Sequence, residues 1–177
     1  MFIKLPSSRA IESGTNMTVS NPTSDYVLGS TDAEHERLIG QAARLAPLTE
    51  RLFREAGIAP GQRVLDLGSG VGDVVMLVAR LVGDSGEVVG IERDPRSLDR
   101  AQARVAEAGL NNVSFIQSDV SQITASERFD AAVGRFILMW LPDPASVCAS
   151  YLCWFAPVEL LPSKNRLGRL FLQFRRT

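Results

Sequence analysis

The stretch Arg63-Val64-Leu65-Asp66-Leu67-Gly68-Ser69-Gly70-Val71-Gly72 is the most informative part of this 177-residue chain. Its first half is a compact apolar run that predicts a buried β-strand, and its second half places three glycines at alternate positions. Glycines directly after a strand let the backbone approach a ligand at the carboxyl end of an α/β sheet. The stretch therefore predicts a strand and a ligand-binding loop, with a tight turn that binds nothing as the alternative.

Strand and helix patterns alternate after this loop. Asp94-Pro95 is a good N-cap and first turn for one of the helices, and Gly83 and Gly109 are suitable helix ends. The alternation predicts an α/β fold, a Rossmann-like doubly wound and mostly parallel sheet with strand order 3-2-1-4. The expected helices are residues 74–81 and 94–108, and the expected strands after the first are residues 87–92, 113–117 and 129–133.

The N-terminal third has a different character from this core. Residues 1–25 are rich in Ser, Thr, Asn, Pro and Gly without apolar periodicity, which predicts a flexible arm. Residues 26–60 predict a helical cover, because Thr31 and Glu34 have capping-box spacing and apolar residues then recur at helical intervals. Pro47 is expected to end or kink that helix, and an apolar face then continues through Leu52 and Phe53 until Gly57 supplies a C-terminal cap.

Composition and charge exclude several classes of function. The chain has 19 Lys+Arg against 20 Asp+Glu, and this balance does not favour nucleic acid as a partner. No apolar run is long enough for a membrane span, and residues 1–5 lack the apolar core of a signal peptide, so a cytoplasmic location is expected. Two cysteines form neither a disulfide framework nor a zinc set, and no metal site is predicted.

The pattern Asp66-x-Gly68-x-Gly70-x-Gly72, with Glu92 closing the second strand, resembles motif I of class I S-adenosylmethionine-dependent methyltransferases. The resemblance covers roughly residues 26–147 and includes a cofactor-binding core at residues 61–147. It implies S-adenosylmethionine as the cofactor. An NAD-linked oxidoreductase is disfavoured, because neither glycine register gives the G-x-G-x-x-G of dinucleotide sites.

The resemblance also implies roles for individual residues. Glu92 has two acceptor oxygens suited to a ribose diol, although a solvated strand-end carboxylate is the alternative. Asp119 is expected to accept from the adenine amino group, with capping of its own loop as the alternative. Asp66 is expected to hold the glycine loop and to orient the methionine ammonium. The complete set of expected cofactor-binding residues is Tyr26, Asp66, Gly68, Ser69, Gly70, Gly72, Glu92, Arg93, Asp119, Val120 and Gly134.

The methyl acceptor is expected to be a small molecule. Gly134-Arg135-Phe136 follows the fourth strand, where nucleobase and protein-glutamine methyltransferases carry an Asn/Asp-Pro-Pro-aromatic signature that is missing from this sequence. No catalytic base is assigned, because a sulfonium methyl group is already activated and positioning is the main requirement. His35, between Glu34 and Glu36, is the sole histidine; we expect it to be solvated, with a role as general base as the alternative.

The end of the chain departs from the family pattern. Residues 148–177 hold five Lys+Arg and one Asp+Glu, and they predict an atypical helix from about 143 to 155 and an edge strand at 169–175. The closing antiparallel hairpin of the family is expected to be absent, leaving a sheet edge open to self-association. Two hypotheses follow: a methyltransferase for small molecules, or a catalytically impaired fragment that retains cofactor binding.

Overall fold

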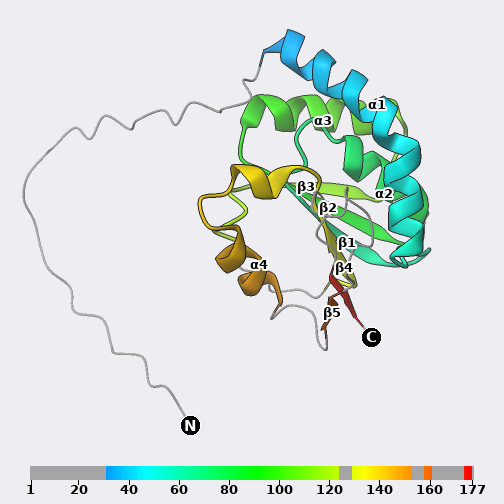
Figure 1. Cartoon of the computed structure of the whole chain (residues 1–177). Helices are drawn as coiled ribbons and strands as arrows, with labels where there is room; N and C mark the ends of the chain where they lie inside the picture. Colours follow the sequence, from blue (N-terminus) through cyan, green and yellow to red (C-terminus); the bar gives the residue numbers. More distant parts are fainter. Residues whose placement is uncertain (1–30, 124–128, 153–157, 161–173, 177) are drawn as a thin grey trace, which may run out of the picture.

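The computed structural model has an α/β architecture built around a six-stranded sheet (Figure 1). It describes residues 31–123, 129–152, 158–160 and 174–176. The helices are α1 (Asp32–Glu55), α2 (Asp73–Val82), α3 (Pro95–Glu107), the short 3-10 helix η1 (Ile137–Trp140) and α4 (Pro144–Leu152). The strands are β1 (Arg63–Leu67), β2 (Glu87–Glu92), β3 (Val113–Gln117), β4 (Ala131–Val133), β5 (Val158–Leu160) and β6 (Phe174–Arg176).

Strand β1 lies at the centre of the parallel part of the sheet. It pairs in parallel with β2 on one side and with β4 on the other, and β2 pairs in parallel with β3. The predicted order 3-2-1-4 is therefore confirmed. Asp66 is opposite both Gly90 and Val133, so the carboxyl ends of β1, β2 and β4 lie at the same edge of the sheet.

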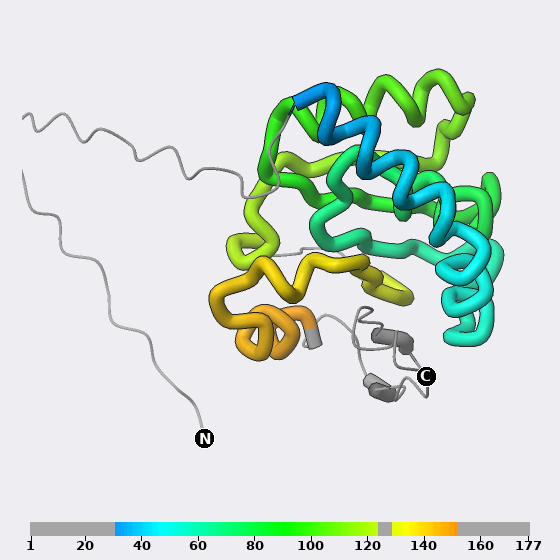
Figure 2. Tube along the Cα trace, turned by 45° about the horizontal axis from the view of Figure 1, so that its top comes forward, coloured from blue at the N-terminus to red at the C-terminus, as the bar shows by residue number. Residues whose placement is uncertain are grey.

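The two faces of the sheet are covered by different helices, as Figure 2 shows. Side chains alternate between the faces along each strand. Val64 and Val133 pack with α1 and α2, whereas Leu65 and Ile91 pack in the cluster that includes α4. Both faces of β1 are therefore buried, which explains its continuous apolar sequence.

Helix α1 begins where the capping residue predicts but does not end at the proline. Thr31 is the N-cap, and its Oγ1 accepts from the Glu34 N–H at 3.2 Å. Of the two outcomes expected at Pro47, an end of the helix does not occur, because α1 continues to Glu55, close to the expected cap at Gly57. Pro47 is exposed, so water can hydrate the carbonyl that loses its helical partner. In the described part of the chain, α1 included, no helix has the length and apolar character needed to cross a membrane.

His35 is buried, and the expectation of a solvated side chain is wrong. Only 3% of His35 is exposed, and its Nε2 lies 3.2 Å from Oγ of Ser97, which is also buried. This hydrogen bond joins α1 to α3. An ion pair of 2.7 Å between Glu36 and Arg100 connects the same two helices at the surface.

The C-terminal strands correct a second expectation. Strand β6 pairs antiparallel with β4, and β5 pairs antiparallel with β6, so an antiparallel pair is present where none was predicted. An unpaired edge of β4 offers free backbone donors and acceptors that a strand can satisfy. That edge is occupied by β6, and β5 becomes the edge strand on this side of the sheet, so self-association through a sheet edge stays a prediction. Of the expected strand at 169–175, residues 169–173 lie outside the described part.

We expect His35→Ala to lower the free energy of unfolding by about 1–3 kcal/mol. The substitution removes a buried hydrogen bond and leaves the buried hydroxyl of Ser97 without the His35 ring as a partner. Glu36→Ala is the matched control on the next residue of α1, and we expect an effect below about 0.5 kcal/mol, as for exposed ion pairs. Urea unfolding of both variants measures the two values. An equal, negligible effect would mean that His35 is solvated after all.

Candidate cofactor-binding site

A crevice lies along the carboxyl ends of β1, β2, β3 and β4. It encloses about 170 Å³, roughly ten times the ~10–15 Å³ that one water needs, so it has room for an organic ligand. The lining residues come from the strand-end loops, from α1 and from the segment after β4. They are Leu38, Gln41, Gly68, Ser69, Gly70, Val71, Asp73, Val74, Ile91, Glu92, Arg93, Ser118, Asp119, Val120, Arg135, Phe136, Ile137, Trp140 and Leu141.

The glycine loop between β1 and α2 forms one wall of this crevice. Gly68, Gly70 and Gly72 all have positive φ, between 53° and 87°, which other residues rarely adopt. At Gly70 a side chain would meet nothing within 4 Å, so the loop leaves open space there. Gly72 does not line the crevice; a side chain on it would approach Ala101 of α3 to 3.1 Å. Gly72 therefore permits close packing between α2 and α3.

Glu92 holds the glycine loop against the end of β2. Its Oε2 accepts from the Gly70 N–H at 2.8 Å, and its Oε1 accepts from the N–H groups of Arg93 and Asp94, each at 2.9 Å. Burial raises the pKa of Glu92, and these amide hydrogen bonds lower it in part. The alternative of a solvated carboxylate is wrong, since Glu92 is 4% exposed. Oε2 accepts one hydrogen bond, from Gly70, and so retains acceptor capacity, and Glu92 lines the crevice, but its ribose role stays a prediction.

Asp119 and Arg93 lie at the β3 side of the crevice. Asp119 Oδ1 accepts from the N–H and the hydroxyl of Ser121, at 2.8 and 2.6 Å, so the aspartate caps its own loop. Burial raises the pKa of Asp119, but the Ser121 hydrogen bonds and Arg93 outweigh it and leave the pKa below its ordinary value. Oδ2 is 3.7 Å from Nη1 of Arg93. Capping does not exclude adenine recognition, because Asp119 also lines the crevice.

Val120 follows Asp119 and is 7% exposed. Its carbonyl accepts from the Tyr151 hydroxyl at 2.5 Å, which anchors this loop to α4. The backbone N–H of Val120 is the group expected to meet the adenine ring, and that role stays a prediction.

Asp66 is a buried carboxylate beneath the glycine loop. Only 1% of Asp66 is exposed, and neither carboxylate oxygen has a hydrogen-bond partner of ordinary geometry among the described residues. Burial raises the pKa of Asp66 well above its usual range, although Arg135 lowers it. The Ser69 hydroxyl is a second buried group without a partner in the described part. An ammonium or hydroxyl donor on a ligand would fit these unused acceptors.

Three of the predicted residues that the structure describes, Asp66, Gly72 and Gly134, do not line the crevice. Gly134 is buried directly after β4, and a side chain there would come within 2.8 Å of Cγ2 of Ile137, so its role in the described structure is close packing. Tyr26 lies outside the described residues. The other predicted residues, apart from Asp66 and Gly72, line the crevice itself.

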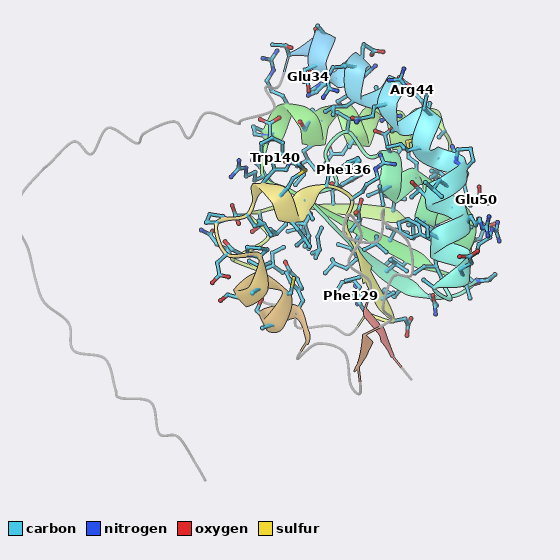
Figure 3. The ribbon with its side chains drawn as sticks, in the orientation of Figure 1. Glu34, Arg44, Glu50, Phe129, Phe136 and Trp140 are labelled. Carbon is cyan, nitrogen blue, oxygen red and sulfur yellow. The ribbon has the colours of Figure 1, made fainter. Side chains whose placement is uncertain are left out.

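Sequence patterns missed several residues that shape the crevice. Arg104 of α3 donates to the Val71 carbonyl at 2.6 Å and to Asp73 at 2.7 Å, and so supports the glycine loop from behind. Phe136, with φ of 66°, is the N-cap of η1, Trp140 is the last residue of that helix, and both line the crevice (Figure 3). Arg135 adds a cation. Only the left-handed backbone of a bulky Phe marks a special position, and φ is not readable from sequence.

The described residues contain no group of three His, Cys, Asp or Glu placed to hold a metal ion. Their donors and acceptors instead fit S-adenosylmethionine. Glu92 offers an acceptor for a ribose hydroxyl, and Asp66 offers unused buried carboxyl oxygens for an ammonium group. The open side of Gly70 lets a ligand approach the backbone between these two acids.

Comparisons with known proteins agree with this fit. A family model described as a methyltransferase domain matches residues 58–156, more than half of the chain. Aklanonic acid methyltransferase DauC of Streptomyces sp. (strain C5) is 33% identical over 106 residues, covering 59% of this chain and 48% of that protein. The 23S rRNA uracil-C(5)-methyltransferase RlmD of Shewanella sediminis (strain HAW-EB3) is 33% identical over 104 residues, covering 56% and 22%.

A solved structure supports the same fold. The structure of a SAM-dependent methyltransferase from Aquifex aeolicus superposes with a TM-score of 0.64 at 24% identity, covering 74% of this chain and 71% of that one. The chain thus spans about half, or less, of the length of the curated relatives named above.

We expect Asp66→Asn to stabilise the ligand-free protein by about 1–3 kcal/mol at pH values above the raised pKa of Asp66, because it removes the ionised form of a buried acid. The pKa of Asp66 is raised in the folded state, so the stability it contributes falls as pH rises from about 4 through that raised value. The difference in stability between Asp66→Asn and the wild type should therefore grow over the same pH range.

Thermal unfolding of both proteins between pH 4 and pH 8 measures this difference. Asp99→Asn, at an exposed position on α3, is the matched control and should shift the melting temperature little. A stability difference independent of pH would contradict a raised pKa for Asp66.

Proposed function

The chain belongs to the S-adenosylmethionine-dependent methyltransferase family, and from this premise we propose that it transfers a methyl group from S-adenosylmethionine to a small-molecule acceptor. The observation that carries the proposal is the crevice itself. The family motif, the Glu92 carboxylate and the buried Asp66 meet at one end of the sheet, beside a cavity of ligand size.

A small acceptor is favoured by the outer part of the crevice. Leu38 of α1 and Phe136 and Trp140 near η1 give it an apolar and aromatic rim. Trp140 is 41% exposed, so its ring is available to a bound molecule. The charge balance of −1 does not provide the cationic surface that an RNA backbone requires. The name of DauC fits this acceptor class, whereas the name of RlmD fits the alternative of RNA.

The chain's own contribution to such a reaction is positioning. When bound, S-adenosylmethionine supplies a sulfonium methyl group that needs no further activation. The Glu92-held loop fixes the donor site, and the apolar rim excludes water from the path between donor and acceptor. We assign no general base, because the sole histidine, His35, is buried between α1 and α3 and does not line the crevice.

Titration calorimetry with S-adenosylmethionine, S-adenosylhomocysteine and NAD tests the donor. We expect the two adenosyl ligands to bind and NAD not to bind. Glu92→Ala should weaken binding about 10-fold or more, since a charge-assisted hydrogen bond contributes roughly 1.5–3 kcal/mol. Glu107→Ala, on the exposed side of α3, is the matched control and should bind normally.

Because Glu92 also holds the loop, Glu92→Ala should be less stable, and thermal unfolding without ligand separates the two effects. Glu92→Gln, which keeps the side-chain size, is the second variant. Unchanged affinity in both variants would remove Glu92 from the binding site.

Methyl transfer to a panel of small phenols, amines and carboxylates tests the acceptor. Turnover of a panel member supports the proposed function. Tight cofactor binding without transfer to any small molecule or to RNA would instead support the alternative of an impaired cofactor-binding fragment.

A further inference from the structure

Arg135 brings a positive charge into the crevice directly after β4. The residue is half-buried and lines the cavity. Its Nη1 lies 3.5 Å from Oγ1 of Thr49 on α1, a long contact. Within the described part of the chain, no carboxylate forms an ion pair with it; Asp73, which is near enough to influence it, is bound to Arg104 at 2.7 Å. A partly buried guanidinium of this kind retains unused donors.

Asp66, whose charge influences Arg135, is the second group that bears on this site. Asp66 is buried with both oxygens unpaired among the described residues. Burial lowers the pKa of Arg135 and raises that of Asp66, while the attraction between them partly reverses both shifts. The two groups therefore influence one another without forming an ion pair. Arg135 therefore places a cation on the wall of the crevice, and Asp66 lies buried beneath the glycine loop with acceptor oxygens that an ammonium group could use. The two groups are complementary to the carboxylate and the ammonium of a zwitterion.

The strand order places this pair relative to the ribose acceptor. Glu92 ends β2, Asp66 lies in the neighbouring β1, and Arg135 follows β4 on the far side of β1. A nucleoside whose ribose reaches Glu92 and whose 5′ substituent crosses the glycine loop extends toward Arg135. In S-adenosylmethionine, that substituent ends in an α-amino acid.

Resting on the proposed function, we propose that the guanidinium of Arg135 binds the carboxylate of the methyl donor, so that the chain recognises the amino-acid end of its donor by charge. The guanidinium of Arg135 could bind a carboxylate on the methyl acceptor in the same way. Binding measured without any acceptor separates these two sources.

The test is a comparison of two ligands that differ only in this group, S-adenosylmethionine and its decarboxylated analogue. Calorimetry on the full chain gives both affinities for the wild type, Arg135→Gln and Arg135→Lys. We expect Arg135→Gln to weaken S-adenosylmethionine binding at least 10-fold while changing the affinity of the analogue less than about twofold. Arg135→Lys keeps the charge and should recover part of the loss.

Arg44→Gln is the matched control, because Arg44 is exposed on α1 and the substitution removes the same charge (Figure 3). It should leave both affinities unchanged, and melting temperatures without ligand establish that each variant is folded. Equal weakening of both ligands by Arg135→Gln would overturn the inference in favour of a structural role. Unchanged affinity for both would overturn it in favour of an acceptor carboxylate or no ligand contact. A wild-type chain that binds neither ligand would refute the proposed function and the inference together.

Discussion

The hydrogen bonds of the Glu92 carboxylate are the constraint on which the crevice depends. One oxygen accepts from Gly70 in the loop after β1, and the other accepts from the two amides that lead into α3. Three backbone donors at a buried position would otherwise lack partners, which a folded chain rarely tolerates. One side chain therefore ties the ends of the two central strands together and keeps the glycine loop in its left-handed conformation.

Unfavourable features concentrate around the same crevice. Asp66 is a buried acid without the amide partners that Glu92 has, and Phe136 has a left-handed backbone with φ of 66°. Each costs stability, and neither contributes to the packing of the two cores. Such features persist where binding needs them. Together they mark the crevice as functional independently of any similarity to other proteins.

The central fold could be predicted closely because local and tertiary signals agree. The bounds of β1, β2 and β3 match their predicted ranges, since each is a short apolar run limited by glycine, proline or polar residues. The burial of His35 could not be predicted in this way. Its neighbours Glu34 and Glu36 are exposed or half-buried, and only the packing of α1 on α3 encloses it. Likewise, the sequence left open whether Pro47 ends or kinks α1, and the burial of Ala42 before it and Phe53 after it holds both parts of one helix against the core.

The crevice also has one part that the sequence pattern predicts, along β1–β3, and one part that depends on the packing of distant segments, the rim. The residues expected to hold the donor come from the contiguous β1–β3 region, where parallel strands bring their carboxyl ends together, and so a sequence pattern can reveal them. The rim is built from Leu38 on α1 and Trp140 on η1, which are far apart in sequence and meet only through folding. Substitutions on α1 or η1 can reshape that rim without touching the hydrogen bonds of Glu92. In the proposed function, donor recognition and acceptor selection therefore rest on separate elements, so the acceptor could change while the donor site is kept.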